Sequence, residues 1–282
     1  MRHLVARAAH SAPRPLAKAA YDGIIAAELA IVRAFDLGNA SDLAGSDLLR
    51  ELTAVVKTFE RPRVVLRLVR SIRRRYPDLR VIVVDDSREP TPMPGVETIV
   101  MPYDSGLSAG RQRALEEVKT KYFLLLDDDH VFYRHTLLER TLALMEACPE
   151  IDILGGDEVL LPLFAPSEFW RGEVYDSGPA TRERGSTIGN LVVCDRVPNF
   201  FLSRTERLRL VGWEPALRTL DHIDFFTRAK GVLTTVYDPD FRVLHARTPL
   251  DTLYMERRLD TESALAVLRQ RYGDAVTPTG DL

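Results

Sequence analysis

Short apolar runs rich in β-branched residues alternate with amphipathic helical patterns through the first half of the chain. Strands are predicted at residues 52–58, 79–84, 96–101, 122–126 and 151–154. Helices are predicted between them, beginning at Pro62, Ser108 and His135. Such alternation builds βαβ units, so the pattern predicts an α/β fold with a mostly parallel sheet.

Polar clusters follow three of these predicted strands. They are Thr58-Phe59-Glu60-Arg61, Asp85-Asp86-Ser87 and Asp127-Asp128-Asp129. Ligands of open parallel sheets bind beyond the carboxyl ends of the strands. We therefore expect the three clusters to meet in one crevice.

The run Asp127-Asp128-Asp129 places three like charges side by side. Adjacent carboxylates repel each other, so a fold retains them in solvent or around a cation. Their oxygens suit hard divalent ions such as Mg²⁺ or Mn²⁺. An acidic turn that caps the next helix is the alternative, but the position after a buried strand favours a metal site.

Two other patterns are weaker when taken alone. Asp86 could accept hydrogen bonds from ribose hydroxyls or from a base N–H. A role in a turn or as a helix cap explains it equally well. The segment from Gly106 through Gly110 to Arg111 has a glycine loop entering a helix, followed by a cation. Helix N-termini and arginine both favour phosphate. This segment matches neither the Walker A loop nor the dinucleotide fingerprint.

The later half of the chain adds a helix start and a lone histidine. A helix is predicted to begin at Asp221-His222-Ile223-Asp224. The spacing of Asp221 and Asp224 places both carboxylates on one face of this helix. They are either catalytic groups or members of a capping box at the helix N-terminus. His245 follows a short strand, where a histidine is more often structural than a ligand. Trp213 suits either a sugar-stacking platform or the core.

Charge and composition narrow the function classes. The 38 basic and 41 acidic residues give a net charge of −3, which argues against an electrostatic nucleic-acid binder. Two cysteines, Cys148 and Cys194, cannot form a disulfide framework and favour a reducing cytosol. No apolar run is long enough for a transmembrane helix. The basic first 20 residues suit a solvated terminus or peripheral contact with an anionic membrane.

Taken in order, the motifs resemble those of GT-A fold glycosyltransferases, over residues of roughly 52–247. The resemblance is strongest to the β-1,4-N-acetylgalactosaminyltransferases that make gangliosides, and broader to the family-two inverting transferases. It is carried by Lys57-Thr58-Phe59, Val83-Val84-Asp85-Asp86-Ser87, Gly106-Leu107-Ser108-Ala109-Gly110-Arg111, Tyr122-Phe123-Leu124-Leu125-Leu126-Asp127-Asp128-Asp129, Val197-Pro198-Asn199-Phe200-Phe201-Leu202-Ser203-Arg204-Thr205 and His222-Ile223-Asp224-Phe225-Phe226.

The resemblance implies a UDP-sugar donor and a divalent metal, Mn²⁺ or Mg²⁺. It assigns these residues to the donor and metal site: Thr58, Phe59 and Arg61 beside the uracil, Asp86 at the base or ribose, Gly110 and Arg111 near the diphosphate, Asp127 and Asp128 at the nucleotide, and Asp129 and His245 on the metal.

The predicted function is transfer of GalNAc, GlcNAc, Gal or Glc to an acceptor hydroxyl with inversion. The acceptor is a glycan, a lipid or a small molecule. Asp224 is the predicted base, with Asp221 and His222 as alternatives. A sugar-phosphate nucleotidyltransferase and a non-catalytic nucleotide-sugar-binding module are the alternative functions.

Three regions are expected along the chain: a helical arm at 1–50, the GT-A domain at 51–250, and a helix with a tail at 251–282. Within them we predict helices at 21–35 and 260–272, a polar connection at 36–47, and late strands at 232–237 and 242–245. The expected location is cytoplasmic, with a peripheral position at the inner membrane face as the alternative. The oligomeric state is left open.

Overall fold

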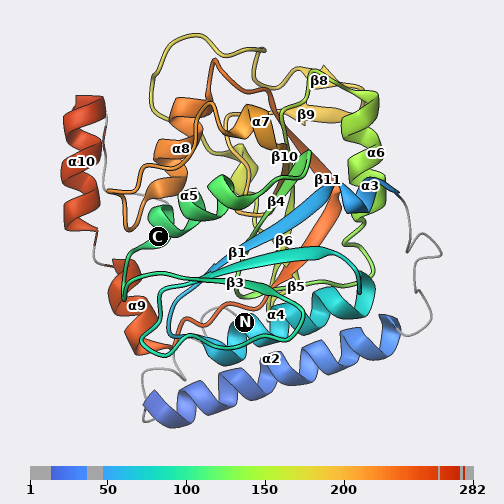
Figure 1. Ribbon diagram of the computed structural model, residues 1–282, viewed down its shortest axis with the longest axis vertical. Helices are drawn as coiled ribbons and strands as arrows, with labels where there is room; N and C mark the ends of the chain where they lie inside the picture. Colours follow the sequence, from blue (N-terminus) through green and yellow to red (C-terminus); the bar gives the residue numbers. More distant parts are fainter. Residues whose placement is uncertain (1–13, 37–46, 260, 274–275, 277–282) are drawn as a thin grey trace.

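The computed structural model describes residues 14–36, 47–259, 261–273 and 276 (Figure 1). An 11-stranded sheet has the order β3-β2-β1-β4-β10-β6-β11-β9-β8, with β5 paired to β11 and β7 to β6. The strands are β1 (Leu52–Thr58), β2 (Arg80–Asp85), β3 (Glu97–Val100), β4 (Tyr122–Asp127), β5 (His130–Val131), β6 (Ile153–Leu160), β7 (Ala165–Pro166), β8 (Thr187–Ile188), β9 (Leu191–Val193), β10 (Phe201–Arg204) and β11 (Thr235–His245).

Helices cover both faces of this sheet (Figure 1). They are α2 (Arg14–Asp36), α3 (Asp47–Arg50), α4 (Pro62–Arg75), α5 (Leu107–Glu117), α6 (Leu138–Ala147), the 3₁₀ turn η1 (Phe169–Arg171), α7 (Thr205–Leu208), α8 (Asp221–Ala229), α9 (Thr252–Leu259) and α10 (Glu262–Tyr272).

The first half of the sheet is parallel, as the alternating pattern predicts. Strand β1 pairs in parallel with β2 and β4, and β2 pairs in parallel with β3. Ala54 and Val56 pack toward α4, whereas Val55 packs toward α5. The centre of β1, Ala54-Val55-Val56, is apolar on both faces because both are covered.

The second half mixes strand directions. Strand β10 lies antiparallel between β4 and β6, and β6 pairs in parallel with β11. The predicted strand at 151–154 is longer, because β6 continues through Gly155 and Gly156 to Leu160. A Cβ on Gly155 would lie 2.2 Å from a Val197 side-chain carbon, so glycine lets the chain cross there. The two strands predicted at 232–237 and 242–245 are one strand, β11, with an irregular register between Tyr237 and Arg242.

Helix α2 lies along the lower edge of the view in Figure 1, and α9 and α10 lie along its left-hand edge. Helix α2 is longer than the predicted 21–35 and buries Ile25 and Leu29 against the region around Leu244. Its Ile24 and Phe35 are exposed. The predicted closing helix at 260–272 is two helices, α9 and α10. Residues 37–46, within the connection predicted at 36–47, and the first 13 residues lie outside the described residues.

No helix in the described part of the chain is both long and apolar enough to cross a membrane. The three-region division of the chain stays a prediction, as does its location.

Candidate active site

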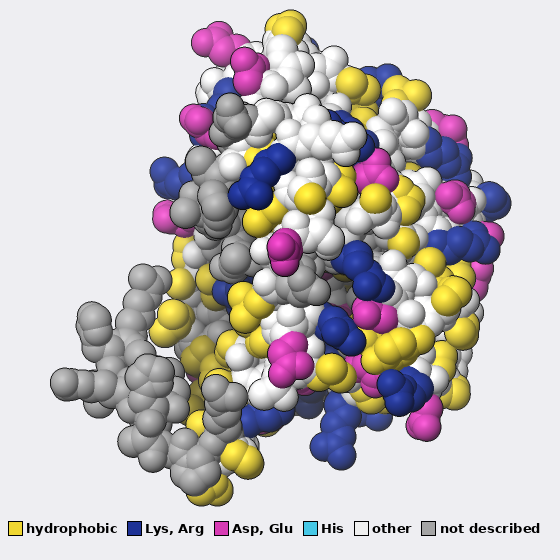
Figure 2. Space-filling view, turned by 90° about the vertical axis from the view of Figure 1, so that its left-hand side faces the viewer, with side chains coloured by type: hydrophobic (Ala, Val, Ile, Leu, Met, Phe, Trp, Pro, Cys, Tyr) yellow, Lys and Arg dark blue, Asp and Glu magenta, His cyan; other side chains and the backbone are white. Residues whose placement is uncertain are grey.

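The carboxyl ends of β1, β2 and β4 meet at a cavity of about 370 Å³, as predicted from their polar ends. Figure 2 looks at the molecule from the side of α9 and α10, where basic and acidic side chains surround a hollow. The predicted residues that line the cavity are Thr58, Phe59, Arg61, Asp86, Asp127, Asp128, Asp221, His222 and His245.

Asp128 is neutralised by a cation of the chain. Arg61 forms an ion pair with Asp128 and reaches Asp129 at 3.4 Å, while the Thr58 hydroxyl donates to Asp128 Oδ2 at 2.8 Å. All of these groups are buried, and burial raises the pKa of Asp128 above its ordinary value. Asp128, which follows β4, is therefore bonded to Thr58 and Arg61 at the end of β1.

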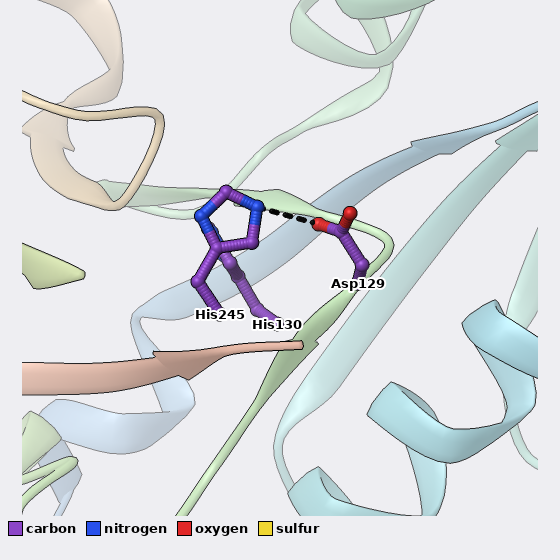
Figure 3. A group of neighbouring side chains, drawn as sticks. All are labelled: Asp129, His130 and His245. Atoms are coloured by element: carbon purple, nitrogen blue, oxygen red, sulfur yellow. Dashed lines mark ion pairs between the residues drawn. The ribbon is translucent and has the colours of Figure 1, made fainter. Parts of the chain in front are cut away.

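Asp129, in the turn between β4 and β5, and His245, at the end of β11, come together from distant parts of the sequence (Figure 3). His245 Nε2 lies 3.1 Å from Asp129 Oδ1, and His245 Nδ1 lies 3.0 Å from Glu158 Oε2. Burial alone would lower the pKa of His245, but the two carboxylates outweigh it and raise that pKa to about 10. Burial would raise the pKa of Asp129, but His245 and Arg61 hold it well below its ordinary range.

This cluster has the chemistry of a divalent metal site. One ligand atom from each of Asp129, His130 and His245 lies within 4.8 Å of the others. Asp129 Oδ1 is buried and faces the His245 nitrogen, with no other partner among the described residues. A set of carboxylate and imidazole donors suits first-row divalent ions. The predicted ligands, Asp129 and His245, thus fit such an ion.

Two neighbours of this pair were not predicted. His130 Nε2 lies 3.1 Å from Glu158 Oε1, and the Asp127 backbone N–H donates to His130 Nδ1 at 3.2 Å. Glu158 therefore touches both imidazoles. The position of His130 directly after the acidic triplet was a usable signal, whereas Glu158 reaches the site only because β6 runs past its predicted end.

Asp86 is held at the end of β2 by two donors. Lys57 Nζ forms a buried ion pair with its Oδ1, and the Gly106 N–H donates to its Oδ2 at 3.0 Å. Gly110 does not line the cavity. A Cβ on Gly110 would lie 2.3 Å from Lys57 Cδ, so the glycine makes room for the lysine that contacts Asp86.

Arg111 lies behind the cavity rather than in it. Its Nη1 donates to Asp221 Oδ2 and its Nη2 to Asp127 Oδ1, both at 2.7 Å, and the side chain is 1% exposed. The predicted contact with a diphosphate does not fit this placement, because two carboxylates occupy these donors. Arg111 instead joins the end of β4 to the start of α8.

The two carboxylates at the start of α8 are separated. Asp221 lines the cavity, whereas Asp224 is 0% exposed and does not. Arg228, Arg271 and the Tyr272 hydroxyl donate to Asp224 at 2.8, 2.6 and 2.8 Å. The predicted role of Asp224 as the base does not fit this geometry, because three donors hold its carboxylate in a buried ion pair.

His222, like Asp221, lines the cavity. Its Nε2 lies 2.6 Å from the Val197 carbonyl, so Nε2 carries the proton, and its Nδ1 is buried without a described partner. Burial lowers the pKa of His222 to about 4. Trp213 stacks on Phe225 with ring centroids 4.9 Å apart and is a core residue, which settles its two alternatives.

Residues 53–159 match the family model described as Glycosyl transferase family 2. The structure of S. aureus TarS 1-349 in complex with UDP is similar over 77% of this chain and 63% of that one, with 16% identity and a TM-score of 0.56. The complex of the same protein with UDP-GlcNAc is similar over 68% of this chain and 57% of that one, with 15% identity and a TM-score of 0.53. The chain therefore contains a glycosyltransferase family 2 domain with the predicted GT-A fold.

The resemblance to the β-1,4-N-acetylgalactosaminyltransferases is confirmed as well. The chain is 37% identical to human Beta-1,4 N-acetylgalactosaminyltransferase 1 over 207 residues, which are 69% of this chain and 39% of that protein. It is 33% identical to mouse Beta-1,4 N-acetylgalactosaminyltransferase 2 over 240 residues, 76% of this chain and 44% of that protein. The chain thus spans less than half the length of these relatives.

Proposed function

We propose that this protein transfers a sugar from a UDP-sugar donor to an acceptor hydroxyl with inversion. The observation that carries the proposal is the convergence of three strand ends on one cavity, beside the buried Asp129–His245 pair. The names of the relatives favour N-acetylgalactosamine as the sugar, and the UDP-bound neighbours support a uridine nucleotide.

In this proposal, Asp86 and Phe59 contact the uridine. Lys57 holds the Asp86 carboxylate from beneath, and Gly106 holds it through its backbone N–H. Both groups fix the carboxylate before a ligand arrives, which lowers the entropy lost on binding.

Asp129 and His245 would hold a divalent cation, with Glu158 orienting the imidazole from Nδ1. Bound there, the cation would supply positive charge for the departing nucleoside diphosphate. Because both side chains are buried and supported on several sides, the ligand atoms are already in place.

Asp221 is our proposed base. It lines the cavity, and Arg111 fixes one of its oxygens at 2.7 Å. Removing the proton of the acceptor hydroxyl makes the oxygen a better nucleophile in a single displacement. His222 is less suitable, because its remaining acceptor nitrogen is buried and a proton there would add a cation near Arg111.

The test measures UDP release from UDP-GalNAc, UDP-GlcNAc, UDP-Gal and UDP-Glc with Mn²⁺, with and without a panel of glycan, lipid and small-molecule acceptors. Asp221→Asn should keep UDP binding but lose at least about 100-fold in turnover. Release of pyrophosphate from UTP and a sugar phosphate would instead identify a nucleotidyltransferase. UDP-sugar binding without any turnover would identify a binding module.

If His222→Gln is inactive and well folded while Asp221→Asn retains turnover, the base is His222 rather than Asp221. Melting temperatures and UDP affinities of both variants show that a loss of turnover does not reflect unfolding.

A further inference from the structure

Six basic side chains line the cavity: Lys57, Arg61, Arg218, Arg247, Arg257 and Arg258. Four of them have carboxylate partners. Lys57 pairs with Asp86, Arg61 pairs with Asp128, and both Arg218 and Arg257 lie within 3.5 Å of Asp104.

Arg247 and Arg258 have no carboxylate within ion-pair distance among the residues that the structure describes. They lie in different parts of the cavity wall. Arg247 follows His245 and Ala246 at the end of β11. Arg258 lies on α9 beside Tyr254, whose ring packs on Arg61, the arginine that is paired with Asp128.

Most donors of Arg258 are unused. A guanidinium offers five N–H groups. In the described part of the chain, Arg258 donates one hydrogen bond, from Nη1 to the Tyr254 hydroxyl at 3.2 Å, although the side chain is half-buried. A half-buried guanidinium with free donors in a polar cavity is suited to an anion that can accept several hydrogen bonds.

Tyr254 fixes the position of this guanidinium. Its ring lies against Arg61, with the guanidinium carbon 3.6 Å from the ring centroid, and Arg61 is held in turn by Asp128. Helix α9 is thereby docked beside the end of β4, and Arg258, one helical turn after Tyr254, is held in the cavity wall.

We propose that Arg258 binds the diphosphate of the nucleotide donor and stabilises it as it leaves. This inference rests on the proposed function. In the transfer, the acceptor oxygen forms a bond to the anomeric carbon, and its proton passes to Asp221. The bond from that carbon to the β-phosphate oxygen breaks, its electron pair stays on the diphosphate, and the added negative charge faces Arg258.

The experiment compares UDP, UMP and uridine binding by calorimetry in the presence of Mn²⁺. Arg258→Gln should weaken UDP binding by about ten- to a hundredfold and leave uridine binding unchanged. Arg258→Lys should weaken UDP binding less than Arg258→Gln does, because lysine keeps the positive charge although it lacks the planar guanidinium. Tyr254→Phe should weaken UDP binding by less than Arg258→Gln does, because the Arg258 guanidinium loses the hydroxyl that accepts its hydrogen bond.

Arg269→Gln is the matched control, since it removes a positive charge from the exposed face of α10, outside the cavity. Unchanged UDP affinity in Arg258→Gln, or an equal loss for UDP and uridine, would overturn the assignment. If the wild-type protein does not bind UDP, the proposed function fails as well, so the two failures are distinguishable.

Discussion

The end of β4 and the start of α8 carry similar acidic motifs but use them differently. At the end of β4, Asp127, Asp128 and Asp129 all lie at the site or directly behind it. At the start of α8, Asp221 faces the cavity and Asp224 faces the C-terminal helix. An acidic residue at the start of a helix can thus face the cavity or form a buried ion pair elsewhere, and its spacing in the sequence does not predict which.

The two motifs differ because the basic partners of their carboxylates come from different parts of the fold. Asp128 is neutralised by Arg61, which also lies at a strand end of the same edge. Asp224 pairs with Arg228 one turn along α8 and with Arg271, which is 47 residues away on a helix that packs from outside the sheet. The first arrangement follows from sheet topology, and the second depends on how the last helix docks.

Asp129→Asn should produce the largest effect in this comparison. The change removes a ligand charge from the proposed metal site while keeping the size of the side chain. Turnover should fall about a thousandfold or more, because the leaving diphosphate loses several kcal/mol of stabilisation. The measurement is UDP release against Mn²⁺ concentration, with melting temperature as the control for folding. Full Mn²⁺-dependent activity in this variant would remove Asp129 from the metal site.

Asp224→Asn should instead lower stability by about 3 kcal/mol, because it leaves two arginines facing a neutral group in a buried position. Its turnover should stay within severalfold of the wild type. Chemical unfolding of Asp224→Asn, Arg271→Gln and the double variant measures the coupling between the two side chains. A stable but inactive Asp224→Asn would restore the carboxylate to the catalytic role that the sequence predicts.

His245 makes the stability of the metal-free protein depend on pH. Its pKa is about 10 in the folded protein and 6.5 in its ordinary state. Its contribution to the free energy of unfolding is therefore complete below pH 6.5 and is lost as the pH rises through about 10. In a chelator, His245→Asn should flatten this decline. An unchanged pH profile would contradict the raised pKa.

The same proton competes with metal, because a coordinating imidazole must be neutral. Apparent Mn²⁺ affinity should therefore increase with pH well above 6.5 and level off near pH 10. A titration of Mn²⁺ at several pH values tests this, and a plateau already at pH 7 would contradict it.

Gly110→Ala should have the smallest effect. The added methyl would overlap the Lys57 side chain, which is flexible and able to shift, so a loss of about 1–2 kcal/mol in stability is expected. UDP affinity should fall modestly as Lys57 moves from Asp86. Ala109→Gly, on the neighbouring residue, is a control for helix propensity. An unchanged stability and UDP affinity in Gly110→Ala would show that this close packing does not matter.

Sequence patterns predicted the parallel half of the sheet and the residues at its ends, because each strand run and its polar terminus are local signals. They did not predict Glu158, since the two glycines of β6 hide the continuation of that strand. They also did not predict that α9 contributes Tyr254 and Arg258 to the cavity, because exposure and docking of a short helix depend on tertiary contacts. Arg111 was found by its motif, but its two partners come from other elements, β4 and α8.

The tie between Asp224 and the last helix has an evolutionary consequence. Arg271 and Tyr272 supply two of the three donors to the buried Asp224 carboxylate, so loss of the last helix would leave it with Arg228 alone. Positions 224 and 271 should therefore covary in an alignment of related chains. A lineage that shortens its C-terminus before residue 271 should carry an uncharged residue at position 224.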